Sequence, residues 1–182
     1  GLLNGKDAAT FSFWIKPSSR WAFMTTPVSD KQNFNYEKYL GMLASSSGYT
    51  VERYNNSGTR LSSVNANASG DWQYVTAVFT ADGTKVYVNG KLLASDTAAV
   101  DIKSLFTADA STWIGHANWG NGEGFSGMID DFKVYGRALN ETEINQLAAK
   151  AIQREQEEAV KEKNCLDINT QFYTNYSVTE SG

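Results

Sequence analysis

Hydrophobic and polar positions alternate along short segments of the chain. In residues 10–17, the odd-numbered positions Phe11, Phe13 and Ile15 are large and apolar, whereas the even-numbered positions are polar apart from Trp14. A period of two is typical of a β-strand that buries one face, and the proline that follows ends such a strand. This segment therefore predicts a half-buried strand.

A meander follows in the middle of the chain. Residues 71–79 have the composition of a second strand, and Asp82 and Gly83 after it are typical of a tight hairpin. Residues 85–88 then lead into Asn89 and Gly90, a second turn pair, before the chain returns. Two hairpins in so short a stretch predict consecutive antiparallel strands.

Residues 124–139 form a glycine-hinged strand with two adjacent carboxylates, Asp130 and Asp131. Carboxylates within a strand that is otherwise buried are costly unless a cation or hydrogen-bond donors satisfy them. One explanation is a bound hard cation, for which carboxylate oxygens are preferred ligands. The other is a pair that faces solvent or binds a lysine or arginine. The local sequence leaves both open.

A helix is predicted to begin after this strand. Asn140 and Glu143 form a capping box, and apolar residues then recur at helical spacing, at Ile144, Leu147, Ala148, Ala151 and Ile152. The first turns can therefore dock on the β-rich part. Residues 153–163 are almost all charged or polar, which indicates a solvated helix that links two units.

Three units are expected from these patterns: a β-rich domain over residues 1–140, a docking or linker helix over 141–163, and a further segment over 164–182. Residues 166–176 return to strand-like composition. They either begin a following domain or pack back on the first one, and we favour the former.

Several segments, taken in order, resemble the concanavalin A-like jelly roll of the laminin-G-like family, in the form found as accessory modules of bacterial secreted proteins. The matching segments are FSFWIKP at residues 11–17, WQYV at 72–75, VYVNGK at 86–91, WIG at 113–115, FSGMIDDFKVY at 125–135 and RAL at 137–139. The resemblance implies an all-β fold, an antiparallel β-sandwich with a C-terminal helix. It also implies an extracellular or cell-surface location.

The same resemblance implies a structural calcium ion. Asp130 is similar to the acid that several glycan-active proteins of this fold place at the start of their last strand. Family members usually carry a further strand upstream that adds ligands to the cation, but only residues 1–9 precede the first strand here. Either the chain is cut inside the domain or another segment fills that edge.

Composition narrows the function classes. Residues 1–140 contain 12 Lys and Arg and 12 Asp and Glu, so the net charge of −4 lies entirely in the tail. A neutral body without a basic stripe argues against nucleic acid. No apolar run approaches the length of a membrane span. Cys165 is the only cysteine, which excludes an internal disulfide and a cysteine-rich zinc site.

Catalysis is not expected of this chain. His116 is the only histidine, and no nucleophile elbow accompanies it. Glycoside hydrolysis needs two carboxyl groups across one bond, and no segment presents closely spaced acids on alternate strand positions. Glu37, Glu52 and Glu123 are isolated, and we expect each to be a solvated loop or strand residue. The parent protein could still be a glycoside hydrolase.

Sugar binding is the preferred interpretation. Carbohydrate sites combine flat aromatic faces with amide, acid or imidazole groups that bind hydroxyls. Residues 18–39 and 116–123 offer this mixture. Trp72 and Trp113 match the family's core and are assigned to packing, whereas Trp14 is left open.

The predicted ligand-binding residues are Trp119, His116, Asn118, Asn121 and Trp21. Trp119 lies between glycine and amide residues that cannot bury it, so we expect it to be the platform for a sugar ring. The predicted function is a non-catalytic carbohydrate-binding accessory module whose partners are a glycan and neighbouring domains. The alternative is a protein-binding, adhesion or spacer module of a surface protein.

Overall fold

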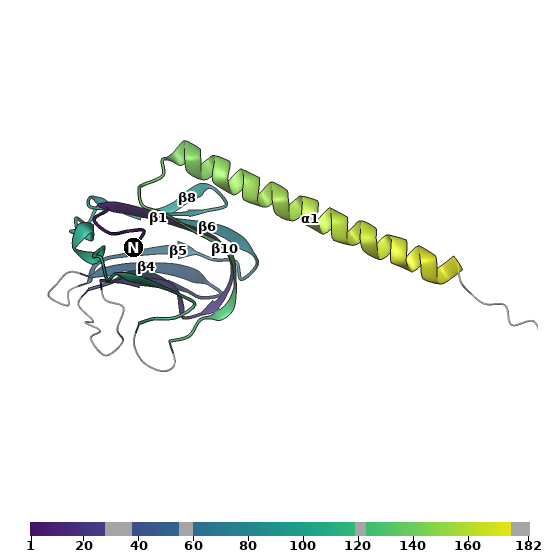
Figure 1. Ribbon diagram of the computed structural model, residues 1–182, viewed down its shortest axis with the longest axis horizontal. Coiled ribbons are helices and arrows are strands. Elements are labelled where there is room, and N and C mark those ends of the chain that lie inside the picture. The colour runs from purple at the N-terminus through teal and green to yellow at the C-terminus, as the bar shows by residue number, and fades with distance from the viewer. Residues whose placement is uncertain (28–37, 55–59, 119–122, 176–182) are drawn as a thin grey trace, which may run out of the picture.

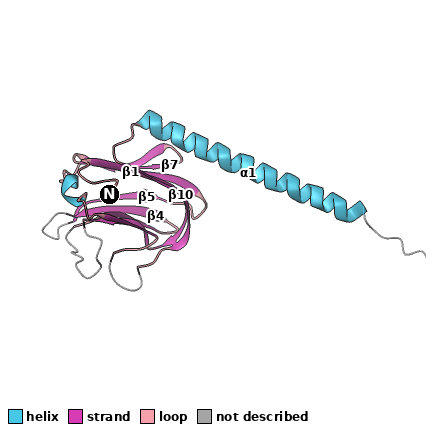
Figure 2. Cartoon of the chain, in the orientation of Figure 1, coloured by secondary structure: helices cyan, strands magenta, loops and turns pink. Residues whose placement is uncertain are grey.

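Two antiparallel β-sheets pack face to face, and a long helix follows them (Figures 1 and 2). This computed structural model describes residues 1–27, 38–54, 60–118 and 123–175. The predicted all-β sandwich with a C-terminal helix is confirmed.

Each sheet has five strands within the described ranges. The first sheet has the order β10 (Ser126–Tyr135), β1 (Ala8–Ser19), β6 (Gln73–Thr80), β7 (Gly83–Val88) and β8 (Lys91–Asp96). The second has the order β5 (Arg60–Asn67), β4 (Gly48–Tyr54), β3 (Leu40–Ala44), β2 (Trp21–Thr26) and β9 (Ser111–Ile114), and a short 3-10 helix, η2 (Ile102–Leu105), precedes β9.

Both predicted hairpins are present, as β6–β7 and β7–β8. The turn between β7 and β8 holds Asn89 at φ +50° and Gly90 at φ +83°. Left-handed φ at both central residues is what a type I′ turn requires, and it explains why this pair occurs there. The sequence therefore specifies this part of the first sheet locally.

Aromatic rings fill the space between the sheets. Phe11 stacks on Phe23 with ring centroids 4.4 Å apart, and Phe13 stacks on Phe132 at 5.0 Å. These rings come from β1, β2 and β10, so they join the two sheets directly. Phe11, Phe13 and Ile15 are fully buried, as their alternation predicts.

The opposite face of β1 is buried too, which the sequence pattern did not predict. Thr10 and Ser12 are inaccessible and Trp14 is 7% exposed. The reason is helix α1 (Glu141–Asn175), which lies over the outer face of the first sheet (Figure 1). A strand that looked half-buried is therefore enclosed from both sides.

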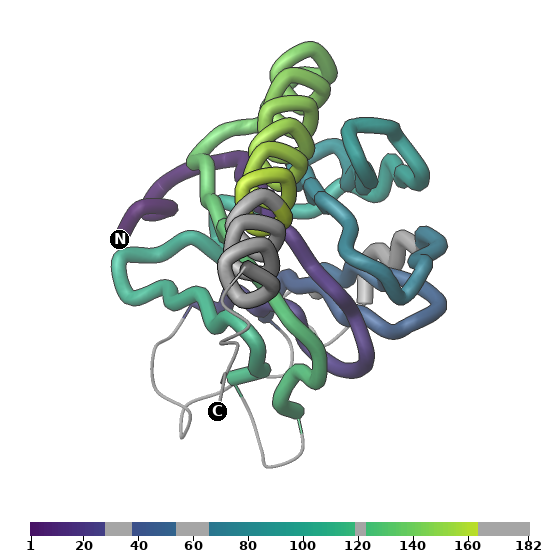
Figure 3. The backbone as a smooth tube through the Cα atoms, turned by 90° about the vertical axis from the view of Figure 1, so that its right-hand side faces the viewer, coloured from purple at the N-terminus to yellow at the C-terminus, as the bar shows by residue number. Residues whose placement is uncertain are grey.

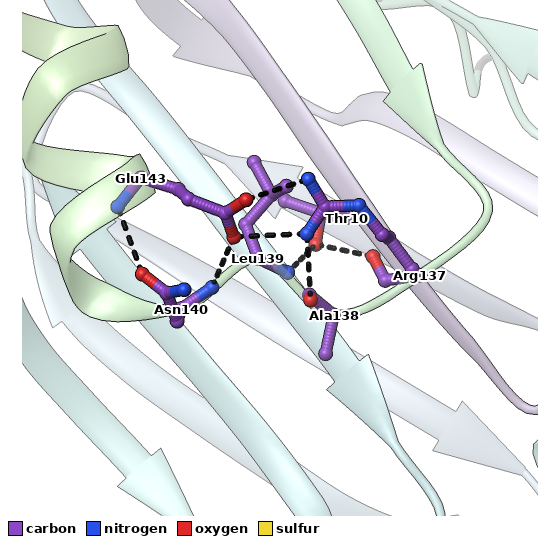
Figure 4. Close-up of polar contacts among 6 residues, drawn as sticks. All are labelled: Thr10, Arg137, Ala138, Leu139, Asn140 and Glu143. Atoms are coloured by element: carbon purple, nitrogen blue, oxygen red, sulfur yellow. Dashed lines mark hydrogen bonds and ion pairs between the residues drawn. The ribbon is translucent and has the colours of Figure 1, made fainter.

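The start of α1 contains the predicted capping box (Figure 4). The Asn140 side chain accepts a hydrogen bond from the Glu143 N–H, and Glu143 Oε2 accepts one from the Asn140 N–H, both at 2.9 Å. Arg137 donates two further bonds to the same carboxylate. Thr10 of β1 donates to the Arg137 carbonyl and accepts from the Leu139 N–H, which fixes the helix start to the sheet.

The first three turns of α1 are docked on the sheet, and most residues after Ile152 are exposed. Ile144, Ala148 and Ala151 are buried, against Tyr74, Val78 and other residues of the first sheet. Residues 153–163 are mostly exposed, as predicted. In Figure 1 the helix projects beyond the sandwich, and Figure 3 views it nearly end-on.

Residues 166–176 have strand-like composition, but they do not form a strand as far as Asn175, because α1 continues to that residue. Helical propagation from a well-capped, docked start outweighs the β-propensity of its last residues. The division into units at residues 140 and 163 stays a prediction. No helix within the described residues is long and apolar enough to cross a membrane.

Candidate functional site

The two loops that the sequence singled out meet at one place. The Trp21 indole N–H donates a hydrogen bond of 3.0 Å to Glu123 Oε2. Arg20 approaches the other oxygen of that carboxylate at 3.5 Å, and its side chain is about half exposed. Arg20 has φ +76°, so the chain turns sharply there between β1 and β2. The residues around 20 and around 123 therefore form one continuous surface.

A buried aromatic cluster supports this surface. Trp21 meets Tyr39 edge-to-face at 5.5 Å, and both pack with Met24 and Ala117. The Tyr39 hydroxyl donates to Glu52 Oε2 at 2.8 Å. We call Trp21, Met24, Tyr39 and Ala117 the Trp21 cluster.

Gly41 on β3 makes room for this cluster. A Cβ atom at Gly41 would lie 2.9 Å from the Trp21 ring and 2.6 Å from the Phe23 carbonyl oxygen. Both distances are well below van der Waals contact, so only glycine lets the indole lie across the strand. Packing of the ring thus depends on a residue 20 positions away in the sequence.

Asn118 holds the second loop against the sheet. Its side chain is fully buried and donates to Thr26 Oγ1 at 3.2 Å. Its side-chain oxygen has no hydrogen-bond partner among the described residues. His116 is half-buried, and its Nδ1 lies against the Ala117 carbonyl. The structure therefore brings His116 and Asn118 to the same side of the second sheet as Trp21.

Not every predicted site residue has the expected form. Trp119 and Asn121 lie outside the described residues. Trp21 is only 3% exposed, so it is not an open platform in this structure but a support beneath the loops. Glu52 is buried and Glu123 half-buried, in contrast to the solvated positions expected. Their hydrogen bonds to Tyr39 and Trp21 explain the difference.

The two adjacent carboxylates of β10 sit at a β-bulge. Ser12 pairs with Lys133 and Trp14 pairs with Asp130, so two residues of β10 oppose Phe13. Asp131, one of these two, has φ +51°. A bulge of this kind lets neighbouring side chains avoid strict alternation. Asp130 and Asp131 thus both stay out of the core although they are consecutive.

Asp131 has cationic partners. Its Oδ2 contacts Lys133 Nζ and lies 3.4 Å from Arg154 on α1. For this residue the structure favours pairing with basic side chains over a metal. Asp130 is exposed, and its Oδ1 accepts the Asp131 N–H at 2.7 Å. No cluster of three or more histidine, cysteine or acidic residues that could hold a metal occurs in the described part of the chain. Calcium at Asp130 stays a prediction.

Trp72 is the clearest correction among the tryptophans. The sequence pattern predicts a packing role for it, but it is 42% exposed and lies just before β6. Trp113, by contrast, is half-buried and donates to Ser111 Oγ at 3.0 Å. Trp14, which the sequence left open, is buried beneath α1 and meets Tyr74 edge-to-face at 5.4 Å.

Comparisons with known proteins agree on the architecture. The family model described as the concanavalin A-like lectin/glucanases superfamily matches residues 1–145. The Ruminococcus gnavus IT-sialidase CBM40, solved with alpha2,3 sialyllactose, is similar with a TM-score of 0.64 and 14% identity, over 80% of this chain and 84% of that one.

Two further solved structures are similar. A heptameric SAP-like pentraxin from Limulus polyphemus has a TM-score of 0.60 and 19% identity, over 79% of this chain and 70% of that one. The NanB sialidase from Streptococcus pneumoniae has a TM-score of 0.62 and 18% identity, over 77% of this chain and 24% of that one. No curated protein sequence is significantly similar to the chain.

Proposed function

Because the chain belongs to the concanavalin A-like lectin/glucanases superfamily, we propose that it is a non-catalytic carbohydrate-binding module of a larger extracellular, glycan-active protein. The observation that carries this proposal is the hydrogen bond between Trp21 and Glu123, which joins two loops rich in aromatic and amide residues. The similar fold of the CBM40 solved with sialyllactose supports it.

The polar groups at this junction suit hydroxyl recognition. Arg20 offers several N–H donors, Glu123 offers acceptor oxygens, and His116 can do either. Trp119 is proposed as the stacking platform beside them. Trp21 lies beneath and positions Glu123, so its contribution to binding is through the loop.

A glycan array with the fluorescently labelled protein tests the proposal, followed by isothermal titration calorimetry with the best ligand. Arg20→Ala and His116→Ala are expected to weaken binding severalfold. Lys85→Ala is the control, because it also removes one positive charge but lies exposed on β7 of the other sheet. The proposal would be contradicted if the protein bound no glycan on the array, or if Lys85→Ala lost as much affinity as the other two variants.

A spacer or protein-binding role is the second candidate. It is supported by the stretch of α1 after Ile152, which is mostly exposed and meets the sandwich through the ion pair of Arg154 with Asp131. A chain that binds no glycan on the array, while its parent protein loses function when residues 153–163 are shortened, would favour this alternative.

A further inference from the structure

A groove lies where α1 leaves the first sheet. It encloses about 280 Å³. Its lining comes from β1, β10, the residue before β6, and the fourth and fifth turns of the helix: Trp14, Asp130, Trp72, Ile152, Glu155 and Gln156. The volume is close to the lower end, about 300 Å³, of the usual range for small-molecule sites, so one sugar ring suits it better than several.

Two indoles form the apolar part of the groove. Trp72 is 42% exposed, so its ring is accessible to a ligand in the groove. Trp14 lies deeper, at 7% exposed, and its indole N–H has no hydrogen-bond partner in the described part of the chain. This donor is itself out of reach of solvent, so Trp72 supplies the accessible indole of the groove.

The polar part of the groove is acidic. Asp130 and Glu155 contribute carboxylates and Gln156 an amide, and no basic side chain is among the lining residues. Two basic side chains beside these acids are engaged in ion pairs: Arg154 lies 3.4 Å from Asp131 and 3.6 Å from Glu155, and Lys133 contacts Asp131.

We propose that this groove is a second binding site, which takes the ammonium group of an amine-bearing sugar. Carboxylates bind an ammonium group through short charge-assisted hydrogen bonds, and an indole face attracts a cation. The apolar face of the sugar ring would pack on Trp72. An anionic sugar would meet two like charges at the groove. That the amine belongs to a sugar rests on the proposed function.

The test uses two chemically matched ligands, a glucosamine hexamer and an N-acetylglucosamine hexamer, at a pH where the free amines are protonated. Tryptophan fluorescence and calorimetry measure binding to the full chain. The amine-bearing hexamer is expected to bind at least tenfold more tightly, and added salt should weaken it. Trp72→Ala and the pair Asp130→Asn with Glu155→Gln should each reduce affinity about tenfold or more.

Glu157→Gln is the matched charge control, because Glu157 is exposed on the same helix but does not line the groove. It should leave affinity unchanged. Melting temperatures of all variants confirm that they are folded. Equal affinity for the two hexamers, or full binding by folded Trp72→Ala, overturns the proposal. Tighter binding of trilysine than of the glucosamine hexamer overturns the assignment to a sugar.

The two sites fail separately. If Trp119→Ala abolishes binding of an array ligand while Trp72→Ala leaves the affinity for the glucosamine hexamer unchanged, the groove proposal fails and the proposed loop site stands. If no array glycan depends on Trp119, Arg20 or His116 while the amine-bearing hexamer depends on Trp72, the loop site fails and the groove stands.

Discussion

The indole nitrogen of Trp21 lies 3.0 Å from Glu123 Oε2, although 102 residues separate them in the sequence. The bond ties the turn between β1 and β2 to the segment that enters β10. Glu123→Ala removes it and is expected to lower the free energy of unfolding by about 1–2 kcal/mol. Glu123→Gln keeps an acceptor and should retain most of the stability in urea unfolding. Equal stability of the two variants would contradict this role.

Arg53 and Asp96 join the two sheets at another edge. The Arg53 side chain of β4 is 0% exposed and donates to Asp96 at 3.0 Å and to the Thr80 carbonyl at 2.8 Å. Burial lowers the pKa of Arg53, and Asp96 acts against that. Asp96→Asn weakens the partner of a buried charge, so we expect a loss of about 3 kcal/mol in chemical denaturation. A loss below about 0.5 kcal/mol would show that the pair does not hold the sheets.

Acid should loosen the start of α1. Hydrogen bonds from Arg137 and from the Asn140 N–H lower the pKa of Glu143 to about 2 from 4.5. Because the folded pKa is depressed, this stabilisation is present above about pH 4.5 and is lost as the pH falls towards 2. Melting temperatures measured over that window should fall less steeply in Glu143→Gln than in the unaltered protein. Identical slopes would contradict the prediction.

Trp119→Ala is expected to weaken glycan binding by about one to two decades. Aromatic stacking contributes about 1–3 kcal/mol per platform, judged from the similar stacking of nucleic acid bases, and 1.4 kcal/mol is about tenfold in affinity. The melting temperature should not change. A variant that unfolds while its folded fraction still binds glycan would make Trp119 a core residue.

Calcium binding by Asp130 with backbone carbonyls is also proposed. If it occurs, EDTA should lower the melting temperature and added calcium should restore it, and Asp130→Asn should abolish both responses. A melt that chelation does not move would dispose of the ion. Because Asp130 also lines the groove beside α1, calcium and an ammonium ligand should compete.

Features that depend on neighbours in the sequence could be predicted. The type I′ turn at Asn89 and Gly90, the capping box of Asn140 and Glu143, and the buried face of β1 are each specified within a few residues. The family segments supplied the order of the strands, and the sandwich followed from them.

Features that depend on distant parts of the chain could not be predicted. Trp72 lies on a segment that matches a core strand of the family. In the structure it precedes the strand and shares a groove with α1, where the docked part of that helix ends. Burial of Trp21 requires Gly41 and Tyr39 beside it. The bulge at Asp131 left one local sign, two consecutive acids in a strand, but only the register shows its position.

The docked helix also sets how far its last residues lie from the sandwich and how they are rotated about the helix axis. After its last apolar contact with the sandwich, at Ile152, it continues to Asn175, a distance of about 35 Å at 1.5 Å per residue. Each residue of an α-helix is also rotated by about 100° about the helix axis relative to the one before it. Deleting one residue from the exposed stretch would therefore shift Asn175 by only about 1.5 Å, but would turn it by more than a quarter of a circle relative to the sandwich. The distance of Asn175 from the sandwich and its rotation about the helix axis are thus both set by the number of residues in the exposed stretch.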